Sequence, residues 1–135
     1  MRNFRRESED GNQEALFVWA AVHVMQYPEL AYLHHIPNGG KRDRMTAIAL
    51  KRRGVRAGVP DISLPVSRGG FHGLYIELKA GTNRATEHQR RWMEFLGQQG
   101  YMTAICYGWE SAAQVIETYL TDPEKIGSAG QVFRE

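Results

Sequence analysis

Two short runs of residues joined by a turn-rich link decide the fold of this chain: DISLPV at residues 61–66 and LYIELK at residues 74–79. In each run apolar residues alternate with other residues, which is the two-residue period of a β-strand. The link SRGGFHG at residues 67–73 is rich in glycine and favours a turn. The sequence therefore predicts a β-hairpin over residues 61–79.

Helical and strand patterns alternate on both sides of the hairpin. Asn12 is a candidate N-cap for a helix whose inward positions recur every three residues, at Leu16, Trp19, Val22 and Met25. Further elements are expected as a strand over residues 31–36, helices over 44–53, 86–99 and 109–120, and a strand over 101–106. In the second helix, we expect Met45, Ile48 and Ala49 to face inward. The order predicts an α/β fold with helices covering a sheet.

Length and composition predict one soluble domain over residues 1–120, with a short flexible N-terminus over about 1–11 and a loose polar tail over 121–135. The apolar fraction of 42% and the charged fraction of 24% are ordinary for a globular protein. No apolar run approaches the roughly 18 residues of a membrane span, and the charged N-terminus does not resemble a signal peptide. Cys106 is the single cysteine and is expected as a buried, reduced thiol. These features predict a cytoplasmic protein.

Basic residues gather in one segment although the net charge is only +2. Between residues 41 and 56 there is one acidic residue, Asp43, and there are seven basic residues: Lys41, Arg42, Arg44, Lys51, Arg52, Arg53 and Arg56. Such an asymmetry is typical of a surface that binds phosphates. The alternative is an ordinary solvated helix face.

Two acidic residues and a lysine occupy positions where the hairpin predicts chemistry. Glu77 and Lys79 share one face of their strand, and Asp61 opens the neighbouring strand directly after Pro60. Two carboxylates held close together repel each other, and a hard divalent cation relieves that repulsion. Oxygen ligands favour Mg²⁺ or Mn²⁺ over zinc. The alternative is an exposed pair on an edge strand, which surface strands commonly carry.

The ordered set of motifs resembles the VRR-NUC family, the virus-type replication-repair nucleases of the PD-(D/E)xK superfamily. The core signature corresponds to Pro60-Asp61 and Glu77-Leu78-Lys79. The resemblance covers about residues 12 to 120, and its further segments are QE at 13–14, HIPNGG at 35–40, LK at 50–51, GVPDI at 58–62, YIELKA at 75–80, Gln89 and GY at 100–101. It implies a restriction-endonuclease-like core, with a central mixed sheet flanked by helices.

The resemblance also implies roles for individual residues. Glu14 would join Asp61 and Glu77 in the metal site, and Gln89 would help to orient the active-site groups. The backbone carbonyl of Leu78 is a further candidate ligand, and Lys79 would orient or deprotonate the attacking water. The expected DNA-binding residues are Asn38, Lys41, Arg42, Arg44, Lys51, Arg52, Arg53 and Arg56.

We therefore expect a Mg²⁺-dependent DNA endonuclease, with Mn²⁺ as a substitute, in a bacterial or phage-infected cell. Stand-alone relatives of phage origin suggest branched DNA such as four-way junctions as substrate, and a homodimer as the active form. Three alternatives stay open: a DNA-binding module with a silent active site, a monomeric nuclease acting on flaps or ends, and a sequence-specific nuclease of restriction type.

Overall fold

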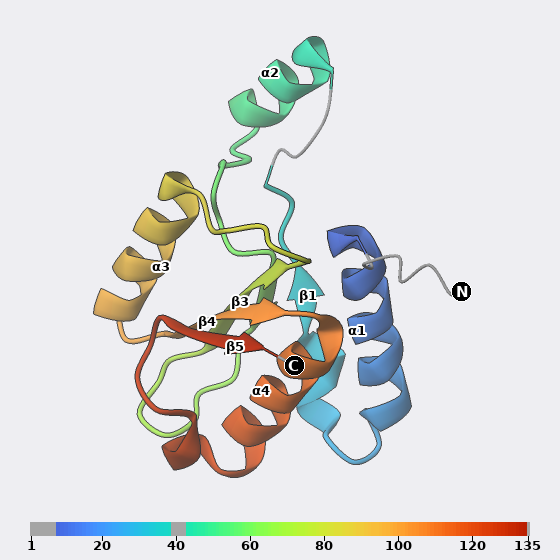
Figure 1. Ribbon diagram of the computed structural model, residues 1–135, viewed down its shortest axis with the longest axis vertical. Helices are drawn as coiled ribbons and strands as arrows, with labels where there is room; N and C mark the ends of the chain where they lie inside the picture. Colours follow the sequence, from blue (N-terminus) through green and yellow to red (C-terminus); the bar gives the residue numbers. More distant parts are fainter. Residues whose placement is uncertain (1–7, 39–42, 135) are drawn as a thin grey trace.

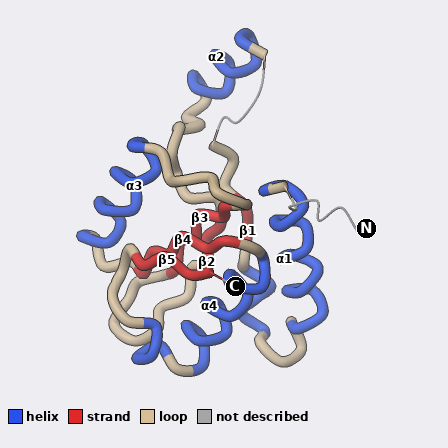
Figure 2. The backbone as a smooth tube through the Cα atoms, in the orientation of Figure 1, coloured by secondary structure: helices blue, strands red, loops and turns tan. Residues whose placement is uncertain are grey.

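The computed structural model describes residues 8–38 and 43–134, and its centre is a five-stranded mixed sheet (Figures 1 and 2). The strands lie side by side in chain order: β1 (His34–His35), β2 (Ile62–Leu64), β3 (Leu74–Lys79), β4 (Met102–Tyr107) and β5 (Gln131–Arg134). The first three strands pair antiparallel, and the last three pair parallel. The expected α/β fold with a central mixed sheet is confirmed.

The predicted hairpin is formed by β2 and β3, in the register Ile62 opposite Ile76 and Leu64 opposite Leu74. Positive φ angles at Gly69 and Gly70 allow the turn that joins the strands. Since β3 is the middle strand and both of its faces are covered, five of its six residues are buried. The polar side chains of β3 therefore lie inside the protein.

Helices cover the sheet on both faces. Figure 1 shows α1 (Glu9–His23) and α4 (Trp109–Thr121) together on one side, and α3 (Glu87–Gln98) on the other. The main core lies under α1 and α4 and includes Leu16, Ile76, Leu78, Ile116 and Tyr119. Cys106 is buried in this core as expected, and burial raises the pKa of its thiol to about 12.

The first helix begins earlier than the sequence suggested, and its inner face is different. Its N-cap is Ser8, whose hydroxyl accepts a hydrogen bond from the Gly11 N–H. Asn12 is buried inside the helix, and its Oδ1 accepts a hydrogen bond of 2.8 Å from the Trp109 N–H at the start of α4. The expected inward positions were wrong for Val22 and Met25, which are exposed, because the inner face follows the series Asn12, Leu16 and Ala20.

The second helix, α2 (Arg44–Arg52), makes no extensive contact with another described helix or strand. None of its residues is buried. Its N-cap is Asp43, whose carboxylate accepts hydrogen bonds from the N–H and hydroxyl of Thr46. Figure 1 shows α2 standing apart from the sheet and from the other helices. The expectation that Met45 and Ile48 face a core was therefore wrong, because α2 has no core to face.

Two further segments differ from expectation. Residues 28–32 form a short 3-10 helix, η1 (Pro28–Tyr32), so the strand expected over 31–36 shrinks to β1. The chain after residue 121 is not a loose tail: η2 (Pro123–Ile126) buries Ile126, and β5 extends the sheet by pairing with β4. No helix among the described residues is long and apolar enough to cross a membrane.

Candidate active site

The β2–β3 register brings Asp61 to Glu77. Ile62 pairs with Ile76, so the residue before β2 lies beside the residue after Ile76 on β3. The Oδ2 of Asp61 accepts a hydrogen bond of 3.0 Å from the Leu78 N–H, which holds the carboxylate against β3. The hairpin geometry thus places the two carboxylates next to each other, as the sequence predicted.

Glu77 is the most constrained group of the site, with only 1% of its surface exposed. Its Oε2 accepts a hydrogen bond of 3.2 Å from Gln89 Nε2 and lies 3.5 Å from Lys79 Nζ. Its Oε1 is buried and has no hydrogen-bond partner among the described residues. A buried carboxylate oxygen without a partner is costly, so this atom calls for a cation or a proton.

The burial of the Glu77 carboxylate also affects its protonation. Burial, followed by the negative charge of Asp61, raises the pKa of Glu77 from 4.5 to about 9. The Lys79 ammonium opposes this shift but does not overcome it. In the metal-free protein Glu77 therefore carries a proton at neutral pH. A bound cation would displace that proton.

The donor set fits a hard divalent cation such as Mg²⁺ or Mn²⁺. Asp61 and Glu77 offer carboxylate oxygens, and one of these oxygens is buried without a partner. Within the described part of the chain, no three His, Cys, Asp or Glu side chains gather closely enough to hold a metal ion. The ion would therefore have to complete its shell with water, backbone oxygen or substrate, as Mg²⁺ commonly does.

Lys79 lies beside Glu77 on the same face of β3 and is only 5% exposed. This burial rules out the alternative in which Glu77 and Lys79 form a solvated pair on an edge strand. The buried Lys79 ammonium therefore offsets part of the cost of burying the Glu77 carboxylate.

Gln89 reaches the site because of how α3 begins. Thr86 and Gln89 form a capping box: the Gln89 Oε1 accepts a hydrogen bond of 2.8 Å from the Thr86 N–H, and the Thr86 hydroxyl accepts one from the Gln89 N–H. With its oxygen held in this way, the Gln89 amide directs Nε2 toward Glu77. The helix cap thereby orients the carboxylate.

The segment after β1 supports Asp61, a contribution that sequence reasoning missed. Asn38, expected on DNA, donates a hydrogen bond of 3.1 Å from Nδ2 to Asp61 Oδ1. The Asp61 carbonyl accepts a hydrogen bond of 2.7 Å from the Ile36 N–H, and His35 Nδ1 lies 2.9 Å from the same oxygen. The pairing of His35 with Ile62 places this segment beside Asp61, and that long-range pairing was not evident from spacing.

The structure does not bring Glu14 to the carboxylate pair. Glu14 is exposed on α1, whereas Glu9 is the acid whose charge adds to the raised pKa of Glu77. Because Glu9, Leu16 and Ala20 share the inner face of α1, counting back from the buried positions would have found it. Starting the helix at Asn12 left Glu9 outside. The acid of α1 whose charge acts on Glu77 is therefore Glu9, and the metal-binding role of Glu14 stays a prediction.

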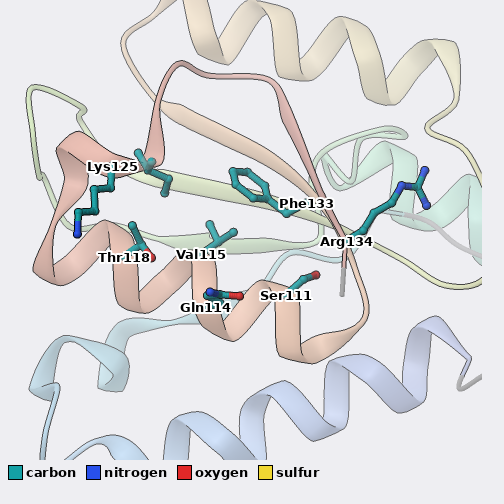
Figure 3. A pocket seen from close by; sticks show the side chains of 8 residues that line it. Ser111, Gln114, Val115, Thr118, Lys125, Phe133 and Arg134 are labelled. Carbon is teal, nitrogen blue, oxygen red and sulfur yellow. The ribbon is translucent and has the colours of Figure 1, made fainter.

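The predicted DNA-binding cations lie on and after α2. Five of them are exposed and form no salt bridge among the described residues: Arg44, Lys51, Arg52, Arg53 and Arg56. Lys41 and Arg42 lie outside the described residues. A separate shallow hollow between α4, η2 and β5 is lined by Val115, Lys125 and Phe133 among others, and it contains none of the site residues (Figure 3).

Comparison with known proteins agrees with this geometry. The chain matches the model of the VRR-NUC domain over residues 6–110, a range that contains every site residue named above. It is similar to a solved structure described as a VRR_NUC domain protein, with 31% sequence identity and a TM-score of 0.73. That similarity covers 93% of this chain and 95% of the other. No curated protein matches the chain significantly.

We predict that Glu77→Gln stabilises the metal-free protein at alkaline pH. Between pH 4.5 and about 9 the carboxyl is ionised in the unfolded chain but protonated in the folded one, so wild-type stability falls as pH rises through this range. The amide has no such penalty. The gain in free energy of unfolding should grow from pH 5 to pH 9, to the order of a few kcal/mol.

Chemical denaturation in EDTA across this pH range measures the effect. Glu94→Gln, which changes an exposed acid on α3, is the matched control and should show no such trend. A difference between Glu77→Gln and wild type that stays constant with pH would contradict the raised pKa.

Proposed function

The chain belongs to the VRR-NUC family, and from that premise we propose that it is a Mg²⁺-dependent endonuclease that hydrolyses phosphodiester bonds in DNA. The observation that supports the proposal most directly is the buried, unpartnered Oε1 of Glu77 beside the Asp61 carboxylate. Lys79 is buried at the same point, next to Glu77. Paired acids and an adjacent lysine are the groups that metal-assisted phosphodiester hydrolysis needs.

In this proposal, each site residue has a separate task. Asp61 and Glu77 would hold the ion, and the Leu78 carbonyl and water would complete its shell, with the charge of Glu9 nearby. Bound Mg²⁺ lowers the pKa of water and offsets the negative charge that develops on the scissile phosphate, and Mn²⁺ would substitute for it. Lys79 stabilises the phosphate and orients the attacking water. Asn38 and Gln89 keep the two carboxylates in register.

The substrate in this proposal is DNA, with a preference for branched forms such as four-way junctions. The exposed cations of α2 and of the segment after it support a polyanionic ligand. A DNA-binding module with a silent site is the competing proposal. The two differ in a single observable, which is strand cleavage in the presence of a divalent metal.

We predict that EDTA abolishes cleavage and that Asp61→Ala or Glu77→Ala lowers the rate by about a thousandfold or more, since each removes a ligand of the ion. Lys79→Ala should slow cleavage while Mg²⁺ affinity measured by calorimetry is retained, because an ammonium is not a metal ligand. Labelled DNA resolved on denaturing gels gives the rates, with Glu94→Ala as the control. Full activity in excess EDTA is incompatible with the proposal.

We also predict that Arg52→Glu combined with Arg53→Glu weakens DNA binding across sequences and makes affinity less dependent on salt, because fewer counterions are released from the DNA. Fluorescence anisotropy at several salt concentrations measures both effects. Lys125→Glu, at the hollow between α4 and β5, should leave affinity nearly unchanged. If the double substitution leaves DNA affinity unchanged, the cations of α2 form an ordinary solvated helix face and do not bind DNA.

The active form in this proposal is a homodimer. One site makes one nick, and resolving a junction needs two symmetry-related nicks, which a two-fold dimer supplies. Exposed apolar side chains on the outer side of α1 and just after it support such an interface, since Val18, Val22 and Met25 are 64%, 70% and 91% exposed. The alternative is a monomer that cuts flaps or ends.

We predict that light scattering gives twice the 15.4 kDa chain mass at micromolar concentration. Val22→Glu with Met25→Glu should lower that mass to one chain, because the charges would face each other across the two-fold axis. Phe95→Glu, at an exposed apolar position on α3, serves as control. A wild-type monomer, both free and on DNA, that nicks one strand of each junction would leave the nuclease proposal intact but remove the dimer.

A further inference from the structure

The projecting helix α2 carries apolar side chains that the described part of the chain leaves exposed. Met45 is 75% exposed and Ile48 is 41% exposed, and no residue of α2 is buried. Every other α-helix in the described residues buries at least two side chains. An amphipathic helix without a covered face needs a ligand to explain its pattern.

The apolar pair lies among cations. At about 100° per residue, Met45, Ile48 and Arg52 fall on one face at spacings of three and four, and Arg44 lies one turn before Ile48 on that same face. The sole acid at this end, Asp43, is engaged as the N-cap, and its hydrogen bonds with Thr46 lower its pKa. The face is therefore apolar at its centre and positive around it.

The positive charge around the apolar face of α2 indicates which kind of ligand covers it. If a second copy covered α2 around a two-fold axis, Arg44 and Arg52 would meet their own copies and repel them. A nucleic acid offers phosphates to the arginines and flat apolar base faces to Met45 and Ile48. Charge complementarity therefore favours DNA over a protein partner.

The described segments before and after α2 contact the candidate active site and α3, respectively. Before the helix, Asn38 is bonded to Asp61. After it, the Ala57 carbonyl accepts a hydrogen bond of 3.2 Å from the Trp92 side chain on α3. The next residue, Gly58, lies so close to α3 that a Cβ atom added there would be 2.8 Å from the His88 carbonyl carbon. Gly58 thus allows a close contact with the turn of α3 that carries Gln89. Figures 1 and 2 show α2 extending beyond this region.

We propose that α2 recognises base faces that are exposed at a branch in the DNA: Met45 and Ile48 pack against these base faces while Arg44 and Arg52 hold the flanking phosphates. The inference rests on the proposed function in that it takes DNA as the ligand. In a continuous duplex the bases are stacked and only their edges are accessible, whereas a branch or flap exposes base faces. The apolar pair therefore distinguishes branched DNA from duplex, and the arginines do not.

The test uses the full-length protein with Ca²⁺ in place of Mg²⁺ to prevent cleavage. Anisotropy compares a 5′-flap DNA with a duplex of the same sequence. Met45→Ala with Ile48→Ala should weaken flap binding by about tenfold and leave duplex affinity and the salt dependence unchanged, because burial of apolar surface is lost and phosphate contacts are kept. Arg52→Ala should weaken both ligands and reduce the salt dependence. Val132→Ala, exposed on β5, is the matched control.

A second readout reports on the bases directly. With 2-aminopurine at the branch, wild-type protein should change the fluorescence on binding, and the double variant should lose that change. Circular dichroism controls for folding, and the variant should keep its helix, since alanine is the best helix former. Equal losses on flap and duplex, or no loss on either, would overturn the inference, as would a change in oligomeric mass without a change in DNA binding.

Failure of the inference and failure of the proposed function give different results. If wild-type protein cleaves DNA with Mg²⁺ but the double variant keeps the full flap preference, only the inference fails. If the double variant loses that preference and wild type cleaves nothing with Mg²⁺ or Mn²⁺, α2 still recognises branched DNA and the nuclease proposal fails.

Discussion

The burial of a carboxylate on the middle strand is the constraint on which the rest of the structure depends. Glu77 lies in β3, which is flanked on both edges by other strands and covered on both faces, so its carboxylate cannot reach bulk water. An ionised carboxylate is expensive in such a place unless opposite charge and hydrogen bonds surround it. Lys79 and Gln89 supply part of that compensation, and Oε1 is left without a partner among the described residues.

Amide side chains connect local helix geometry to this site. Gln89 closes the capping box of α3 with its oxygen and binds Glu77 with its nitrogen, so the start of the helix sets the position of the carboxylate. Asn12 accepts a hydrogen bond from the first N–H of α4. This bond connects α1 to α4 on the face of the sheet opposite α3. Asn38 binds Asp61 from the β1 side. In each case one amide joins two elements that are far apart in sequence.

The molecule separates its charges in space. Acidic groups converge inside, at Asp61 and Glu77 with Glu9 nearby, whereas the basic groups of α2 stand outside on a helix with no buried residue. The net charge of +2 conceals this division. Asn38, before α2, contacts Asp61, and Ala57, after α2, contacts α3.

The sequence by itself determined the hairpin, the shared face of Glu77 and Lys79, and the proximity of Asp61, because a two-residue period sets which residues share a face and a turn-rich link makes the two strands neighbours. It also identified the helices that begin near Thr86 and Trp109, whose N-terminal boundaries follow from local features. These are short-range properties, and local physical chemistry decides them.

Only the tertiary structure decided which faces are buried and which distant residues meet. Val22, Met25, Met45 and Ile48 were expected inside on hydrophobicity alone, but burial depends on whether another element covers the helix. The effect of the Glu9 charge on Glu77 and the hydrogen bond from Asn38 to Asp61 follow from how α1 and β1 pack against the hairpin. Residues 131–134 form a strand because the edge of β4 satisfies their backbone hydrogen bonds. The sequence of this polar segment alone does not show that such an edge is available to it.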